Sequence, residues 1–118
     1  MFDFEKLAVY KKAKSFNSEI RDLIKSNRFD TTTTDQLKRA AFSVVLNIAE
    51  GSGRFSKADR CNFFIISRSS LFECVAILDV IKDEDLTNME EYNDLYSQAE
   101  ELSRVLCAMI KNLKNKKA

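Results

Sequence analysis

The sequence predicts an all-α protein, an up-down-up-down antiparallel four-helix bundle that assembles as an oligomer. Its 118 residues include no proline and only two glycines, whereas a sheet protein needs many turn residues. Apolar residues recur at helical spacing in four stretches that are separated by breaks. Each stretch covers about 18 to 28 residues, and short links between helices of similar length favour antiparallel neighbours.

A chain of this length is expected to form one domain, residues 1–118, and its 45% hydrophobic content is enough for a bundle core. No apolar run approaches the roughly 18 residues of a membrane span, so no membrane association is expected. The start of the chain is acidic and mixed, unlike the basic start of a signal peptide. We therefore expect a cytoplasmic protein.

The first helix is expected from about Asp3, as its N-cap, to Ser26. Its apolar stripe is formed by Phe4, Leu7, Ala8, Ala13, Phe16, Ile20, Leu23 and Ile24. Threonines 31–34 disfavour a continuing helix, so the second helix is expected to start near Thr33 or Thr34, with a threonine hydroxyl as its cap. It should end at residues 51–53, because glycine accepts the left-handed conformation that closes a helix.

The third helix is expected to open at Ser56, which acts as N-cap, with Asp59 at its third position. Its stripe is formed by Phe63, Phe64, Ser67, Leu71, Cys74, Val75, Leu78 and Ile81, and residues 82–85 break the pattern. Residues 87–90, with Thr87 as cap, predict a capping box for the fourth helix. Its stripe is formed by Tyr92, Leu95, Tyr96, Ala99, Leu102, Leu106, Met109, Ile110 and Leu113.

The second helix carries two apolar sectors. At about 100° per residue, an ordinary core face is formed by Leu37, Ala40, Ala41, Val44, Val45 and Ile48. A second sector is formed by Phe42, Leu46 and Ala49. One bundle core covers one sector, so we expect the second to pack on another subunit as the oligomer interface. The alternative is that the first or fourth helix covers Phe42 and Leu46 within one chain.

A polar stripe lies between the two sectors and is formed by Gln36, Arg39, Ser43, Asn47, Glu50 and Arg54. These side chains can hydrogen-bond to one another one turn apart, or reach Ser70 and Glu73 on the third helix. We expect an interhelical or intersubunit polar network that fixes register or subunit number. Contact with a ligand or a nucleic acid is the alternative role.

No catalytic residue, metal ligand or cofactor can be assigned. The chain has no histidine, which removes the commonest general base at neutral pH and the commonest partner for zinc. Glu50 and Glu73 are possible paired carboxylates, but no motif supports them. Cys61, Cys74 and Cys107 form no CxxC pair and are expected to be free thiols in or near the core. We therefore expect a protein that is not an enzyme.

Charge is spread unevenly, although the net charge is +1. Residues 1–68 carry 13 basic and 8 acidic side chains, residues 69–110 carry 2 and 10, and residues 111–118 carry four lysines. Basic side chains bind phosphate without reading sequence, so they are the candidate nucleic-acid contacts. The candidates are Lys11, Lys12, Lys14, Lys38, Arg54, Lys57 and Arg60, with Arg39, Arg68 and the lysine tail as further basic positions. Ordinary surface charge is the alternative for any one of them.

Residues 36–54 read QLKRAAFSVVLNIAEGSGR. This segment resembles the signature of a family of bacterial four-helix-bundle proteins, the 23S rRNA intervening-sequence proteins, which is close to QLRRAxxSIxxNIAEGxGR. Residues 63–73, FFIISRSSLFE, are similar to the family's FLxIAxGSLxE, and the opening of the first helix also matches. Ser67 and Ser69 stand where alanine and glycine are common, and residues 29–34 lack the usual proline and glutamate.

The resemblance implies a homo-oligomer, typically a pentamer. Relatives include the accessory protein of diversity-generating retroelements, which works with nucleic acid and a reverse transcriptase. The partners that the resemblance implies are therefore further copies of the chain, RNA or DNA, and a protein such as a reverse transcriptase.

Two functions remain open. The first is a homo-oligomer that binds nucleic acid, RNA above DNA, through basic residues that several subunits contribute. The second is a protein-interaction scaffold without nucleic-acid binding, which uses the acidic region 69–110 or the oligomer surface. Charge reversal at Lys11, Lys12 and Lys14 should abolish binding under the first hypothesis only.

Overall fold

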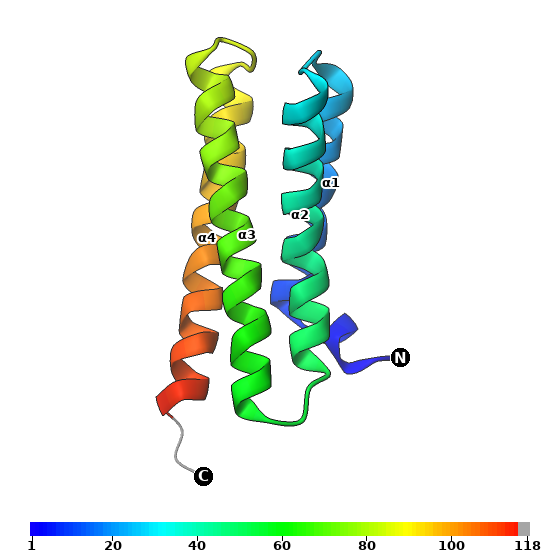
Figure 1. The fold of residues 1–118 in the computed structure, drawn as a ribbon, viewed down its shortest axis with the longest axis vertical. Coiled ribbons are helices and arrows are strands. Elements are labelled where there is room, and N and C mark those ends of the chain that lie inside the picture. The colour runs from blue at the N-terminus through cyan, green and yellow to red at the C-terminus, as the bar shows by residue number, and fades with distance from the viewer. Residues whose placement is uncertain (116–118) are drawn as a thin grey trace.

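The computed structural model describes residues 1–115 and shows an antiparallel four-helix bundle (Figure 1). A short 3₁₀ turn, η1 (Asp3–Lys6), precedes the helices α1 (Ala8–Ser26), α2 (Thr31–Ser52), α3 (Lys57–Asp83) and α4 (Met89–Asn115). Each helix packs on the next, and α4 closes back on α1. The predicted up-down-up-down fold is confirmed. The α1–α2 and α3–α4 turns share one end of the bundle, and the α2–α3 turn lies at the other (Figure 1).

The core runs along the bundle axis and takes one face from each helix. All six residues of the predicted core sector of α2 are buried. The stripes of α3 and α4 are confirmed at their central positions, where Ser67, Leu71, Cys74, Leu78, Leu95, Ala99, Leu102 and Leu106 are buried. In α1 the stripe shifts at its start, because Val9 is buried and Ala8 is exposed. The extended backbone of Leu7 separates this helix from η1, so one helical register does not span both.

The predicted starts of α1 and α2 were wrong. Asp3 caps no helix but opens η1, and α1 begins at Ala8 after Leu7, without a side-chain cap. Helix α2 begins at Thr31 rather than near Thr33 or Thr34, because the Asp30 carboxylate accepts a hydrogen bond from the Thr33 amide at 2.7 Å. Hydrogen bonding by the Thr33 side chain, followed by that of its amide, lowers the pKa of Asp30. A first-turn amide has no carbonyl partner within its helix, so the aspartate cap stabilises a start that threonine propensity disfavours.

The cap of α3 is confirmed and that of α4 lies one residue later than predicted. The Ser56 hydroxyl accepts from the Asp59 amide at 3.1 Å. At α4, Asn88 rather than Thr87 is the cap, because its Oδ1 accepts from the Glu91 amide at 2.7 Å. Its Nδ2 donates to the Glu91 carboxylate, which completes the box. Asn88 and Thr87 are both residue types that cap helices well. Which of them is the cap depends on where the first helical turn begins.

The glycines do not close α2 in the predicted left-handed conformation. Gly53 ends the helix with φ −89°, and its amide donates to the Glu50 carbonyl at 3.1 Å. Gly51 lies inside the helix and is buried against α3. A Cβ at Gly51 would lie 2.8 Å from Cε1 of Phe64 and 3.0 Å from Cβ of Phe63. Gly51 is therefore required for the close approach of α2 to α3.

We predict that Gly51→Ala lowers the free energy of unfolding by about 1 to 3 kcal/mol, because the added methyl overpacks the contact with Phe64. Alanine is the better helix former by about 1 kcal/mol, so a loss must come from packing. Gly53→Ala is the matched control, since its Cβ would make only ordinary contacts with the carbonyl oxygens of Glu50, at 3.6 Å, and Ala49, at 3.9 Å. It should raise stability by about 0.5 kcal/mol. Urea unfolding of both variants measures the difference, and equal changes would contradict the packing account.

Candidate interaction surfaces

Hydroxyl groups bridge α2 and α3 at the centre of the bundle. The hydroxyls of Ser43 and Ser70 lie 2.8 Å apart across the two helices. Asn47 Nδ2 donates to the Ser43 carbonyl at 2.9 Å and to the Ser43 hydroxyl at 3.0 Å. The fully buried Ser67 hydroxyl donates to the Val44 carbonyl at 2.8 Å. Ser67 was placed in the predicted apolar stripe, and its role as a polar contact between helices was not predicted.

The rest of the predicted polar network does not join this group. Glu50 pairs with Arg54 at 3.0 Å on the helix surface. Gln36 and Glu73 line opposite walls of a hollow between α2 and α3. Arg39 is exposed and makes no side-chain hydrogen bond within residues 1–115. The structure therefore brings together Ser43, Asn47 and Ser70 from the predicted set.

The second apolar sector of α2 is exposed on the single chain. Phe42 and Leu46 keep 44% and 47% of their surface, and Ala49 is half-buried. Helix α1 therefore covers this sector only in part, through Arg21, and whether another subunit covers the rest stays a prediction. Exposed large apolar side chains continue on α3 at Ile65, Ile66, Phe72 and Val80, whereas α1 has none. The bundle thus exposes apolar side chains on both α2 and α3, the two helices that Figure 1 shows in front.

A ridge forms where the apolar sector of α2 meets α1. The Arg21 guanidinium of α1 lies over the Phe42 ring, 5.4 Å from its centroid. Arg21 Nε is buried and has no hydrogen-bond partner among the described residues. Lys38 lies one turn before Phe42 and Leu46 one turn after it, so all three share this side of α2. We call Arg21, Lys38, Phe42 and Leu46 the basic ridge.

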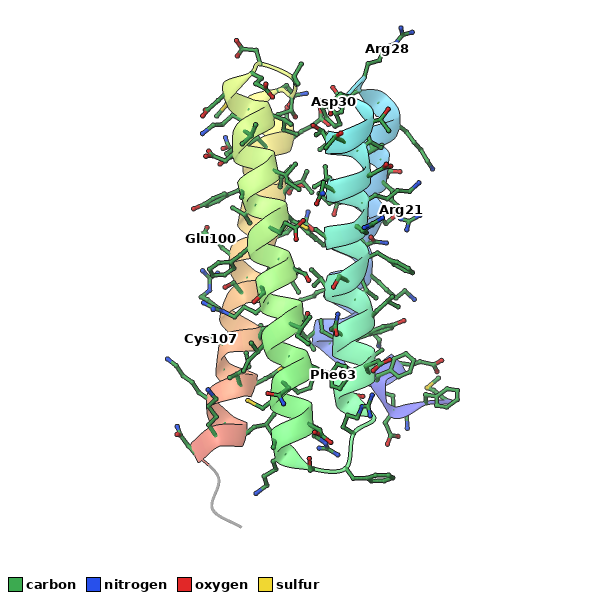
Figure 2. All side chains as sticks on the ribbon, in the orientation of Figure 1. Arg21, Arg28, Asp30, Phe63, Glu100 and Cys107 are labelled. Atoms are coloured by element: carbon green, nitrogen blue, oxygen red, sulfur yellow. The ribbon has the colours of Figure 1, made fainter. Side chains whose placement is uncertain are left out.

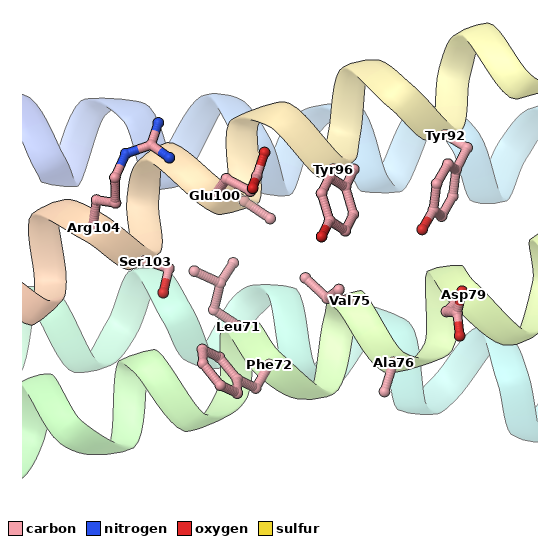
Figure 3. A pocket seen from close by; sticks show the side chains of 11 residues that line it. Leu71, Phe72, Val75, Ala76, Asp79, Tyr92, Tyr96, Glu100, Ser103 and Arg104 are labelled. Carbon is pink, nitrogen blue, oxygen red and sulfur yellow. The ribbon is translucent and has the colours of Figure 1, made fainter.

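An open groove of about 680 Å³ runs between α3 and α4 on the opposite flank (Figure 3). Phe72, Val75 and Ala76 of α3 form one wall, and Tyr92, Tyr96 and Ala99 of α4 form the other. Its polar side chains are Asp79, Glu100, Ser103 and Arg104. Asp79 pairs with Lys82 at 3.3 Å, whereas Glu100 makes no ion pair within residues 1–115. We call this hollow the α3–α4 groove.

The structure separates the candidate nucleic-acid residues into three places. Arg54, Lys57 and Arg60 lie together at the α2–α3 turn, where Arg60 Nε donates to the Arg54 carbonyl at 2.6 Å. Lys11, Lys12 and Lys14 lie exposed on α1. Lys12 pairs with Glu101 of α4, and this contact lowers the pKa of Glu101. Lys38 lies near the other end of the bundle, on the basic ridge.

Basic side chains of α3 and α4, which are far apart in the sequence, come together toward the α2–α3 end of the bundle. Lys57 of α3 and Lys114 of α4 line one hollow, and Arg68, Lys111 and Lys114 line a neighbouring one. We call Lys57, Arg68, Lys111 and Lys114 the basic cluster. Because α3 and α4 run antiparallel, the start of one lies beside the end of the other. Lys116 and Lys117 of the predicted lysine tail lie outside the described residues.

The cysteines occupy core and near-core positions as predicted, and none forms a disulfide. Cys61 and Cys74 are buried, and Cys107 is half-buried. Burial, followed by the negative charge of Glu73, raises the pKa of the Cys74 thiol to about 12. Within residues 1–115 no group of three acidic or cysteine side chains could hold a metal ion. None of the described helices combines the length and apolar character needed to cross a bilayer.

Residues 5–108 match the family described as 23S rRNA-intervening sequence protein. The fold is similar to the crystal structure of a protein of unknown function from the S23 ribosomal protein family of Bacteroides thetaiotaomicron VPI-5482. The TM-score is 0.83 at 21% sequence identity, and the match covers 88% of this chain and 99% of that one. A comparison with curated protein sequences finds no significant match.

We predict that Asn47→Leu lowers the free energy of unfolding by about 1 kcal/mol, because it removes the two hydrogen bonds to Ser43. The exposed Asn62 of α3 makes no side-chain hydrogen bond in residues 1–115, so Asn62→Leu is the matched control. Thermal unfolding and solution mass should be recorded for both variants. An Asn47→Leu protein with unchanged melting temperature and mass would contradict the structural role of this side chain.

Proposed function

Since the chain belongs to the 23S rRNA-intervening sequence protein family, we propose that it is a non-enzymatic homo-oligomer that binds nucleic acid, RNA in preference to DNA, through its basic side chains. The observation that carries the proposal is the uneven charge of the two ends of the bundle. The basic cluster and Arg54 and Arg60 gather at the α2–α3 end. The α3–α4 turn at the other end is acidic, with Asp83, Glu84, Asp85, Glu90 and Glu91.

Self-assembly is supported by the exposed apolar side chains of α2 and α3. Monomeric proteins rarely expose contiguous apolar patches larger than a few hundred Å². Here Phe42 and Leu46 of α2 and Ile65, Ile66, Phe72 and Val80 of α3 are all more than a third exposed. Further copies of the chain that pack on α2 and α3 would remove these side chains from water. Several copies aligned in one direction would also bring their basic ends together.

Binding to phosphate is supported by the position of the basic cluster. Lys57 and Lys114 are exposed, and neither forms an ion pair within the described residues. Their charges are therefore available to phosphates, and each neutralised phosphate releases counterions. Because such contacts are to the backbone of the nucleic acid, they predict affinity without sequence specificity.

A protein-interaction scaffold is the second candidate. The specific observation in its favour is the acidic α3–α4 turn, where five carboxylates lie within residues 83–91 against no basic side chain. A partner with a basic surface would complement this end of the bundle. Absence of RNA and DNA binding near physiological salt would favour this function over the first.

We predict that Lys57→Glu/Lys114→Glu weakens RNA binding at least tenfold at low salt, because two cations of the basic cluster become anions. The slope of log affinity against log salt should fall in magnitude by about 1 to 2 for each bound subunit. A salt titration with purified protein, freed of nucleic acid, measures both quantities.

Lys25→Glu/Arg28→Glu is the control for net charge, because both side chains are exposed at the opposite end of the bundle. This variant carries the same change in charge and should keep most of the affinity. An equal loss in both variants would contradict a localised site. Failure of the wild-type oligomer to bind RNA or DNA would contradict the proposed function itself.

A further inference from the structure

We infer that the α2–α3 turn selects single-stranded nucleic acid over a duplex, by stacking an unpaired base on the ring of Phe55. The inference rests on the proposed function, and it names the class of nucleic acid and the side chain that recognises it. Phe55 lies in the turn that joins the two helices at the basic end of the bundle (Figure 1). Its side chain is fully exposed, more than any other large apolar side chain of residues 1–115.

Hydrogen bonds hold the backbone on both sides of Phe55. The Arg54 amide donates to the Gly51 carbonyl at 3.2 Å, and Ser56 caps α3 directly after Phe55. Arg60 Nε donates to the Arg54 carbonyl at 2.6 Å and ties the first turn of α3 to the link. The ring is therefore presented from a fixed backbone, so the chain loses little conformational freedom when a ligand contacts it.

Phe55 contributes neither to the core nor to the geometry of the turn. Phenylalanine is not among the residue types that favour turns, which are glycine, proline, asparagine, aspartate and serine. Phe64 of α3 is buried in the core, whereas the Phe55 ring contacts no other aromatic ring within residues 1–115. Single exposed apolar side chains are common on protein surfaces. The residues around Phe55 therefore indicate whether it has a role.

The sequence around Phe55 is rich in cations. Residues 54–60 contain Arg54, Lys57 and Arg60 against one acidic side chain, Asp59. Lys57 and Arg60 are exposed and form no ion pair within the described residues. A strand that lies over the ring therefore has two unpaired cations, within five residues of Phe55, for its phosphates.

Arg54, the residue before Phe55, makes its contacts within the chain. Figure 2 shows Phe63 at this end of the bundle, where the Arg54 guanidinium lies over its ring, 4.6 Å from the centroid. Arg54 also pairs with Glu50 at 3.0 Å. Arg54 is thus held against α2 and α3, while the neighbouring Phe55 ring is left open to a ligand from outside the chain.

An aromatic ring among cations is suited to a single strand and not to a duplex. Cations bind the phosphates of either form, and a duplex has the higher density of charge. Bases stack on aromatic side chains without regard to sequence, because every base has a π-face. In a duplex the base faces are covered by their neighbours, so the Phe55 ring can stack only on an unpaired base. The ring therefore favours the single strand.

A comparison of single-stranded and double-stranded RNA of one length and sequence tests the inference at a fixed salt concentration. The wild-type protein, freed of nucleic acid, should bind the single strand more tightly near physiological salt. Phe55→Ala should weaken single-strand binding about tenfold, because one stacked base is lost, and leave duplex binding unchanged. Since the ring is fully exposed, the melting temperature should stay close to that of the wild type.

Two further substitutions at the same position separate stacking from apolar contact. Phe55→Leu keeps an apolar side chain without an aromatic ring and should lose as much affinity as Phe55→Ala. Phe55→Trp should keep or increase the affinity, because indole offers a larger ring. The chain has no tryptophan, so this variant also provides a single fluorescent reporter. An intact single strand should quench its emission, whereas a strand of the same length that lacks bases should not.

The outcomes separate this inference from the proposed function. Phe55→Ala with unchanged single-strand affinity, or with an equal loss for both forms of RNA, would overturn the inference while nucleic-acid binding stands. Wild-type affinity in Phe55→Leu would also overturn it, because an apolar contact would then suffice. A wild-type protein that binds neither form, nor DNA, would overturn the proposed function and the inference together and leave Phe55 to a contact with a protein.

Discussion

Helices α2 and α3 approach one another more closely than larger side chains would allow. Gly51 packs against the Phe64 ring at this contact, and the Ser67 hydroxyl donates to the Val44 carbonyl. Ser43 and Ser70 then meet across the same contact. These three contacts, spread along both helices, set the register and the rotation of α2 relative to α3. Close-packed helices cannot slide or rotate gradually, since each small residue fits one position on its neighbour. The orientation of every other face of α2 follows from this contact.

The side of α2 that carries Ser43 and Gly51 packs on α3. Its core sector therefore faces the bundle axis, and its second apolar sector must face outward. Phe42 then lies beside α1, where Arg21 covers one face of its ring. The same rotation of α3 leaves Ile65, Phe72 and Val80 on the surface. Their exposure is therefore a consequence of the tight α2–α3 contact. The bundle thus has a well-packed centre and apolar side chains on α2 and α3 that the single chain leaves exposed.

The fold was predictable because its signals are local. Helical spacing, the absence of proline and the Ser56 cap give four helices and most of their core positions. The helix starts at Thr31 and Met89 were missed because aspartate, asparagine and threonine compete as caps, and the first-turn geometry decides between them. The α3–α4 groove and the basic cluster were not predictable, because their residues come from helices whose relative rotation depends on contacts such as Ser67 with Val44. The exposed sector of α2 was visible in the sequence because a single helix contains all of it.

Under the proposed function, assembly and nucleic-acid binding would be physically linked. One chain has a net charge of only +1, and its basic end holds a handful of cations, so its non-specific affinity for a phosphate backbone should be weak. Copies of the bundle aligned in one direction would place every basic cluster on one side of the oligomer and every acidic turn on the other. Each additional subunit would then contact the same strand at a high effective concentration, so avidity would exceed the affinity of a single chain. The acidic ends would repel the strand and direct it to one face. Assembly through the exposed apolar side chains would thus combine the few cations of each subunit into a continuous phosphate-binding surface.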